Sequence, residues 1–283
     1  MLVLNGFASL AERYDGFILD LWGVIHDGIA PYPGAIDVLT RLRDGGKPAV
    51  LLSNAPRRSH MAQQAMRQMG IPDDLYRDLL TSGEATHRML RDRTDPFFAA
   101  LGRRMYHLGP QRDRSVFEGL DLQQVASPAA ADFLLNTGPN DEGFPTDASL
   151  FDGDLRACFL AALPMVCANP DLVVVRGGKL VICAGLLAQR YEALGGAARW
   201  VGKPDPTIYG VVLDLLRLPP SRVLAVGDSL RTDIAGAAGV GIDSCWVLGG
   251  IHRDELNGDA EAAQEAVRRA GLAPVVAVPA FSW

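Results

Sequence analysis

The chain has 283 residues, enough for one large domain or two ordinary ones, and its 48% hydrophobic and 21% charged residues are typical of a globular protein. A formal net charge of −6 argues against nucleic acid as a partner, and the pairs Arg57-Arg58 and Arg103-Arg104 are interpreted as solvated surface. Without a signal-peptide pattern, a membrane-length apolar run or metal-binding cysteine spacing, we expect a cytoplasmic protein with reduced thiols and no membrane partner.

The first predicted elements alternate between strand and helix. The apolar run that begins at residue 17 predicts a strand buried on both faces, and it ends at the carboxylate of Asp20. A helix is expected over 35–43 and a second buried strand over 49–52, which is followed by Ser53 and Asn54. A helix over 56–69 comes next. This order predicts a doubly wound parallel sheet, and therefore the α/β class.

The pattern changes after Ser82. Thr81 and Glu84 have the spacing of a capping box, which opens a helix through residue 90. Proline and glycine then become denser, and short strands are predicted over 105–108, 133–136, 165–168 and 172–175. We therefore expect an inserted α/β domain over residues 83–196, with residues 1–82 and 197–283 forming the core.

The core pattern resumes near Lys203. A helix is predicted over 208–216, followed by a buried strand over 223–226 that leads into Asp228. Asp233 lies near the start of the next helix, which is expected from about residue 232. The last predicted strands cover 244–248 and 275–278.

Polar residues follow three of the predicted core strands, and the carboxyl ends of parallel strands share one edge of the sheet. Crowded carboxylates of Asp20, Asp228 and Asp233 would repel one another unless a cation intervened, and carboxylate oxygens suit Mg²⁺. The alternative is that each aspartate caps a separate turn. Lys203 supplies a positive charge, and Ser53 can donate to a phosphate oxygen. Together these groups suit phosphoryl transfer through an aspartyl-phosphate intermediate.

Four segments in this order resemble the four motifs of the haloacid dehalogenase (HAD) superfamily: Asp20-Leu21-Trp22-Gly23-Val24, Leu52-Ser53-Asn54, Gly202-Lys203-Pro204 and Gly227-Asp228-Ser229-Leu230-Arg231-Thr232-Asp233. Their spacing is similar to the class IIA branch, the sugar-phosphate, nucleotide and p-nitrophenyl phosphatases. The resemblance implies a Rossmann-like parallel-sheet core with an inserted α/β class IIA (C2-type) cap domain. It covers essentially the whole chain.

The resemblance also implies roles for individual residues. Asp20 is expected to be the nucleophile and a Mg²⁺ ligand, and Lys203 to orient Asp20 and the phosphate. The remaining implied roles are Mg²⁺ ligation by the Trp22 carbonyl, Asp228 and Asp233, phosphate binding by Ser53 and Asn54, and substrate contacts from the cap by Asn169 and Asp171. The glycine-rich cap stretch of the branch is represented here only by Val181-Ile182-Cys183-Ala184-Gly185.

Trp22 departs from the superfamily pattern, because most of its phosphatases have a second aspartate there that acts as acid and base. Indole has only an N–H donor and cannot do this work, although the main-chain carbonyl can still bind a metal. His26 or Asp27 could replace the lost acid, or each could simply belong to a turn. Haloacid dehalogenases carry an aromatic residue two positions after the nucleophile, so carbon–halogen hydrolysis is an alternative.

The expected function is Mg²⁺-dependent hydrolysis of a small phosphomonoester, such as a sugar phosphate or nucleotide, with turnover weakened by Trp22. A catalytically impaired protein that binds a phosphorylated ligand is the alternative from another class. The expected partner is a small phosphorylated metabolite, and a homo-oligomer is compatible with the sequence.

Overall fold

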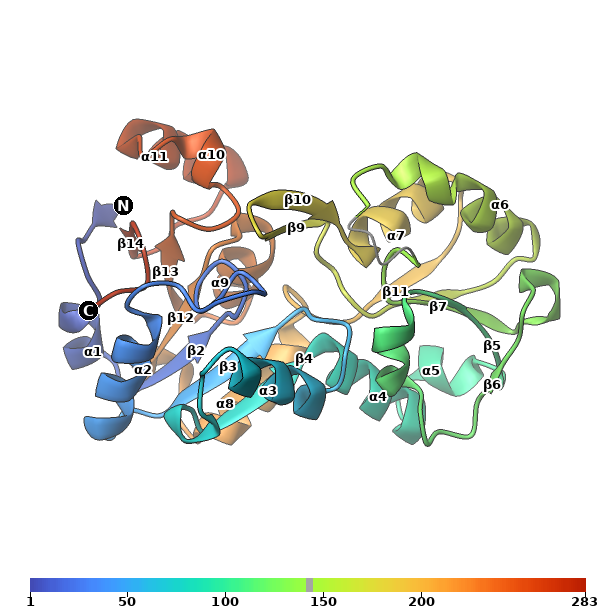
Figure 1. Ribbon diagram of the computed structural model, residues 1–283, viewed down its shortest axis with the longest axis horizontal. Coiled ribbons are helices and arrows are strands. Elements are labelled where there is room, and N and C mark those ends of the chain that lie inside the picture. Colours follow the sequence, from blue (N-terminus) through green and yellow to red (C-terminus); the bar gives the residue numbers. More distant parts are fainter. Residues whose placement is uncertain (141–144) are drawn as a thin grey trace.

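Two parallel β-sheets lie side by side in the computed structural model, which describes residues 1–140 and 145–283 (Figure 1). One sheet is built from both ends of the chain and the other from its middle. The predicted α/β class is confirmed. Among the described helices none is both long and apolar enough to cross a membrane.

The core sheet has seven strands, and all of its neighbouring strands are parallel. In spatial order they are β1 (Leu2–Val3), β14 (Val276–Val278), β13 (Asp243–Val247), β12 (Val223–Gly227), β2 (Gly16–Leu19), β3 (Ala49–Ser53) and β4 (Asp78–Thr81). Strands β12, β2 and β3 are buried throughout, as their continuous apolar runs predict.

Helices cover both faces of the core sheet because successive side chains of a strand point to opposite faces. Phe17 and Leu19 pack on one face with α1 (Ala8–Arg13), α2 (Ala35–Asp44) and α3 (Ser59–Gln68). Ile18 packs on the other face with α8 (Pro206–Leu216) and α9 (Ala235–Gly239). Trp246 packs against α10 (Arg253–Leu256) and α11 (Ala260–Ala270).

The second sheet has five parallel strands with its own apolar clusters. In spatial order these are β11 (Ala198–Trp200), β8 (Met165–Cys167), β7 (Phe133–Asn136), β5 (Arg104–Leu108) and β6 (Gln123–Gln124). One face packs on α6 (Asp152–Leu160) and α7 (Ala184–Ala193), and the other on α4 (Ser82–Asp92) and α5 (Pro96–Ala100).

A β-hairpin lies between the two sheets in Figure 1. Its antiparallel strands are β9 (Val173–Arg176) and β10 (Lys179–Ile182). The turn residues Gly177 and Gly178 have φ angles of 53° and 75°, which suit a two-residue hairpin turn. The strand predicted over 172–175 is present as β9, but among the described residues it pairs only with β10 and does not join the five-stranded sheet. The sequence analysis did not predict β10.

Several predicted boundaries differ from those observed. The helix predicted over 56–69 begins at Ser59, and the one predicted from residue 232 is preceded by a π-helical turn, Leu230–Ile234. No described strand between β4 and β12 joins the core sheet. However, β11 pairs with β8, so the second sheet continues past the predicted end of the insertion at residue 196. The division into a core and a cap domain remains a prediction.

Candidate active site

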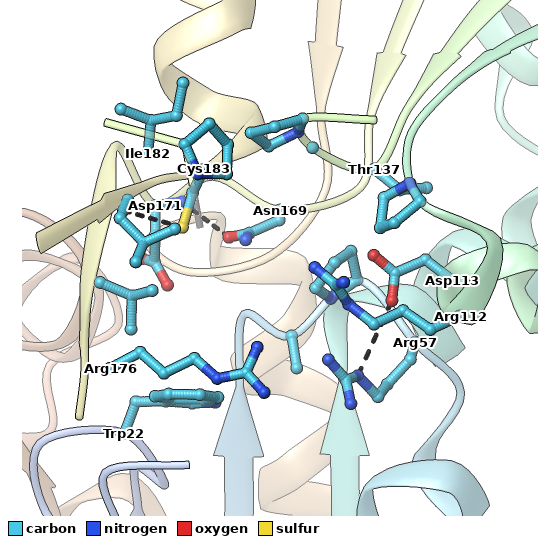
Figure 2. Close-up of a pocket in the computed structure, with 18 residues that line it drawn as sticks. Trp22, Arg57, Arg112, Asp113, Thr137, Asn169, Asp171, Arg176, Ile182 and Cys183 are labelled. Atoms are coloured by element: carbon cyan, nitrogen blue, oxygen red, sulfur yellow. Dashed lines mark hydrogen bonds and ion pairs between the residues drawn. The ribbon is translucent and has the colours of Figure 1, made fainter. Parts of the chain in front are cut away.

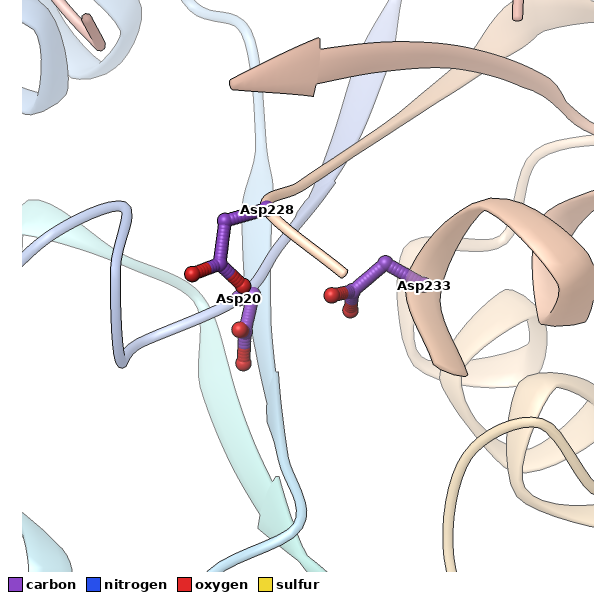
Figure 3. A group of neighbouring side chains, drawn as sticks. All are labelled: Asp20, Asp228 and Asp233. Atoms are coloured by element: carbon purple, nitrogen blue, oxygen red, sulfur yellow. The ribbon is translucent and has the colours of Figure 1, made fainter. Parts of the chain in front are cut away.

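Three neighbouring core strands bring polar side chains to one sheet edge. Asp20 follows β2, Ser53 ends β3 and Asp228 follows β12. Asp233 lies in the π-helical turn after β12. One carboxylate oxygen from each of the three aspartates lies within 4.8 Å of the others, and all three residues are buried (Figure 3). The convergence expected from the strand order is therefore present.

Two glycines let the aspartates approach the backbone this closely. A Cβ atom at Gly23, which has φ +76°, would lie 1.8 Å from Oδ2 of Asp228. A Cβ atom at Gly227 would lie 2.1 Å from Cγ of Asp233. No other residue could occupy these positions without displacing a carboxylate, because such distances are far below van der Waals contact.

Lys203 follows the last strand of the second sheet, but its side chain reaches the aspartates of the core. It comes shortly after β11, yet its Nζ donates to Oδ1 of Asp20 at 2.6 Å and to Oδ1 of Asp233 at 2.6 Å. The same amine donates to the carbonyl of Leu52 at 3.0 Å. All three ammonium hydrogens thus have an acceptor. The side chain is buried, and its ammonium group is the positive charge that the sequence analysis expected beside Asp20.

Burial dominates the electrostatics of the cluster. Burial and the charge of Asp233 raise the pKa of Asp20, and Lys203 opposes this shift. Burial, followed by the charges of Asp20 and Asp233, raises the pKa of Asp228 well above its ordinary value. Burial alone would lower the pKa of Lys203, but the two aspartates raise it. Three buried carboxylates against one ammonium leave negative charge at the site, so the oxygen donors fit a divalent cation.

Asn54 connects the core to the segment before the hairpin. Its Oδ1 accepts from the backbone N–H of Lys203 at 2.8 Å, and its Nδ2 donates to Oδ1 of Asp171 at 2.8 Å. Asn169 Oδ1 accepts from the backbone N–H of Asp171 at 2.9 Å. The Oγ of Ser53 accepts from the backbone N–H of Ala55 at 3.2 Å. The structure therefore places both predicted cap residues beside the predicted phosphate-binding residues.

The Trp22 ring is held from two sides. It lies edge-on to the His26 ring, with 5.2 Å between the centroids. A Cβ atom at Gly28 would lie 2.1 Å from Cη2 of the indole. The indole therefore packs tightly in the loop after β2, while part of it still lines the cavity that contains Asp20.

His26 and Asp27 both serve the same loop. Nδ1 of His26 accepts from the backbone N–H of Gly28 at 3.0 Å, and burial lowers the pKa of His26 to about 4. Asp27 Oδ1 accepts from the backbone N–H groups of Ile29 and Ala30 at 2.9 and 2.8 Å. Neither residue lines the cavity that contains Asp20. Of the two alternatives, the geometry favours the turn roles over acid catalysis.

Two cavities meet at Trp22, Asp171 and Val174. One contains Asp20 and Asp228, and the hairpin strand β9 forms part of its wall. The other, which we call the arginine cavity, is shown in Figure 2 and contains three guanidinium groups, those of Arg57, Arg112 and Arg176.

The arginine cavity contradicts one sequence interpretation. Arg57 was predicted to be solvated surface, but it lines the cavity, while Arg58 pairs with the buried Glu84, with 2.7 Å between Nε and Oε2. Sequence patterns could not have found the three arginines, because they lie far apart in the chain, in a loop, a 3-10 helix and a strand. The four cysteines are buried and unpaired, as expected.

The fold and this site define a hydrolase class, and the comparisons agree. The family model described as haloacid dehalogenase-like hydrolase matches residues 17–123, and the one described as HAD-hydrolase-like matches residues 200–270. A crystal structure of a haloacid dehalogenase-like hydrolase from Brucella suis 1330 is 31% identical, covers 99% of this chain and 100% of that chain, and has a TM-score of 0.85. The chain belongs to the haloacid dehalogenase-like hydrolase family.

Named relatives place it among the phosphatases of that family. Human chronophin is 29% identical, over 86% of this chain and 84% of its own length. Ribonucleotide monophosphatase NagD of Escherichia coli K12 is 28% identical, over 83% of this chain and 87% of its own length. The predicted superfamily, its class IIA branch and the phosphatase type are confirmed, which leaves no support for the dehalogenase alternative.

Proposed function

We propose that the protein hydrolyses small phosphomonoesters with Mg²⁺ through an aspartyl-phosphate intermediate. The observation that carries this proposal is the position of Lys203, whose Nζ bonds Asp20 and Asp233 while Asp228 lies beside them. A carboxylate held this way has a fixed direction of attack and a neighbouring cation for the phosphoryl charge.

In the first step an Asp20 oxygen attacks phosphorus, and the bond from phosphorus to the leaving oxygen breaks. The Ser53 hydroxyl and the backbone N–H of Asn54 would hold the phosphoryl oxygens, while Lys203 holds Asp20 in position beside them. In the second step water attacks the same phosphorus, which releases inorganic phosphate and restores the Asp20 carboxylate. Each step moves one phosphoryl group, so neither needs a redox partner.

The leaving oxygen needs a proton in the first step, and Trp22 cannot supply it. His26 and Asp27 are bonded within their own loop. We therefore infer that turnover is fastest for leaving groups that depart as stable anions. If tryptophan in place of the aspartate removed turnover entirely, the protein would only bind phosphorylated ligands.

Asp20, Asp228, Asp233 and the Trp22 carbonyl are the groups that would hold Mg²⁺. When bound, the ion would neutralise charge on the phosphoryl oxygens and on the crowded carboxylates. The carboxylates are also positioned by protein groups: Lys203 donates to Asp20 and Asp233, and the backbone N–H of Ile251 donates to Oδ2 of Asp228 at 2.7 Å.

The proposed partner is a small phosphorylated metabolite in the cytoplasm. The name of NagD, a ribonucleotide monophosphatase, supports a phosphate ester of this size. A net charge of −6 offers no attraction to nucleic acid. A homo-oligomer is compatible with this function.

A phosphatase screen with and without Mg²⁺ tests the proposal. We expect p-nitrophenyl phosphate and acyl phosphates to be hydrolysed only with the metal, and Asp20→Asn to be inactive. Binding of phosphorylated compounds without any release of phosphate would instead establish the binding protein.

A further inference from the structure

The arginine cavity begins where the cavity around Asp20 ends. Both are lined by Trp22, Asp171 and Val174. The arginine cavity also touches Ala55, which directly follows the phosphate-binding pair Ser53 and Asn54. A substrate with its phosphoryl group at Asp20 would therefore extend past the indole into the arginine cavity.

Its three arginines come from separate parts of the chain. Arg57 lies in the loop between β3 and α3, Arg112 in the 3-10 helix Gln111–Val116, and Arg176 at the end of β9. Figure 2 shows all three around the same space, with the Trp22 ring at its base. Burial, together with the positive charges of Arg112 and Arg57, lowers the pKa of Arg176, so the three charges act on one another.

Among the described residues, two carboxylates line the same cavity. Asp113 is buried and lies 3.8 Å from Nε of Arg57, which it helps to position. Asp171 accepts from Asn54 at the boundary with the Asp20 cavity, and burial raises its pKa. Three guanidinium groups, which keep their charge at every accessible pH, thus lie around one space. Gathering like charges is unfavourable, and an anionic ligand would offset this cost.

We propose that the substrate carries a second negative charge on its leaving group, a carboxylate or a second phosphate, which binds Arg57, Arg112 and Arg176. This inference rests on the proposed phosphatase function. Guanidinium groups form paired hydrogen bonds with both carboxylates and phosphates. The geometry therefore predicts a negative charge on the leaving group but does not distinguish a carboxylate from a phosphate. Binding energy from this remote group would also hold the phosphoryl group against Asp20, where an acid is missing.

Matched substrates test the charge directly. Phosphoglycolate and its neutral amide differ in one group, and so do ethylene glycol bisphosphate and ethylene glycol monophosphate. We expect kcat/KM to favour the charged member of at least one pair by about tenfold or more, the range of a charge-assisted hydrogen bond. The pair with the larger ratio identifies carboxylate or phosphate as the natural group.

Variants assign this preference to the cavity. Arg112→Gln and, independently, Arg176→Gln should bring the charged-to-neutral ratio close to one. Arg114→Gln is the matched control, because Arg114 lies in the same 3-10 helix but packs on the Phe117 ring and does not line the cavity. Its ratio should equal that of the wild type.

The outcomes separate this inference from the proposed function. Hydrolysis of p-nitrophenyl phosphate with equal kcat/KM for the charged and neutral member of each pair, or with no hydrolysis of either charged member, would overturn the inference and leave the phosphatase function standing. A preference that survives both Arg112→Gln and Arg176→Gln would also overturn it. If no phosphate ester or acyl phosphate is hydrolysed, both proposals fail.

Discussion

The two parallel sheets are built alike, yet their carboxyl edges carry different chemistry. The strands of the core sheet lead into Asp20, Ser53 and Asp228. Strands β5, β7 and β8 of the second sheet lead into Arg112, Thr137 and Asn169, which line the arginine cavity. The comparison suggests that the core edge supplies the reacting groups and the second edge supplies recognition.

Lys203 is the exception that joins the two edges. It follows β11 of the second sheet but bonds Asp20 of the core. Asn54 makes a reverse connection, since it belongs to the core and donates to Asp171. Changes at the core edge should therefore affect the reaction with every substrate, whereas changes at the second edge should affect the choice among substrates.

The largest effect is expected from Asp20→Asn. An amide cannot form the aspartyl-phosphate, so kcat should fall on the order of 10⁴-fold for every substrate. Asp27→Asn is the control, because the Asp27 carboxylate accepts from the backbone N–H groups of its own turn and does not line the cavity that contains Asp20. Steady-state rates on aryl and acyl phosphates measure the loss. A variant that keeps wild-type rates would remove Asp20 from the mechanism.

Trp22→Asp should have the next largest effect, in the opposite direction. A carboxyl group at this position could protonate the leaving oxygen, which is worth up to roughly 10²–10⁴-fold. Alkyl phosphates should gain more than p-nitrophenyl phosphate, because p-nitrophenolate leaves without a proton. The gain is reduced by the void that the indole leaves beside Gly28.

Comparing the two substrates in both proteins measures this effect. Trp22→Phe is a control for the lost indole, since phenylalanine supplies no acid. Efficient hydrolysis of alkyl phosphates by the wild type would contradict the prediction and assign the proton to another group.

Asp228→Ala should weaken Mg²⁺ binding by more than about 100-fold. The change removes one carboxylate ligand, and Asp20 and Asp233 alone cannot enclose the ion. Titration calorimetry with Mg²⁺ measures this in the absence of substrate. Asp259→Ala is the control, since the Asp259 side chain caps α11 by accepting from the backbone N–H of Glu261. Equal affinities in Asp228→Ala and the wild type would exclude Asp228 from the metal site.

The smallest effect is expected at Glu84, where Arg58 and Arg88 stabilise a carboxylate at the join between the sheets. Although burial opposes the shift, the two arginines lower the pKa of Glu84 from 4.5 to about 2. Because the folded-state pKa is the lower one, this stabilisation is complete above pH 4.5 and is lost as the pH falls toward 2.

Glu84→Gln should therefore reduce the free energy of unfolding by about 1–3 kcal/mol at pH 7, and by progressively less at acidic pH. Urea unfolding at several pH values measures the difference, with the exposed Glu118→Gln as the control. A difference that stays constant down to pH 3 would show that the ion pair is not its source.

Much of the core could be predicted from the sequence because its signals are local. The strand before Asp20 is an apolar run, and the position of Asp228 after another such run follows from the same pattern. Parallel strands align their carboxyl ends, so the meeting of these aspartates required only the strand order. The hairpin was missed because the valines after Asp171 look the same in a hairpin as in a buried sheet strand.

The sequence by itself determined the family, the parallel core and the gathering of the three aspartates at one sheet edge. Each depends on residues close together in the chain or on strand ends that every parallel sheet aligns. Only the tertiary structure shows that Lys203 follows β11 of the second sheet, and only it shows which arginines line the cavity beside Trp22. Arg57, Arg112 and Arg176 come together only through the packing of the second sheet and the hairpin against the core. No local pattern encodes that arrangement, because it depends on how separately formed elements pack against one another.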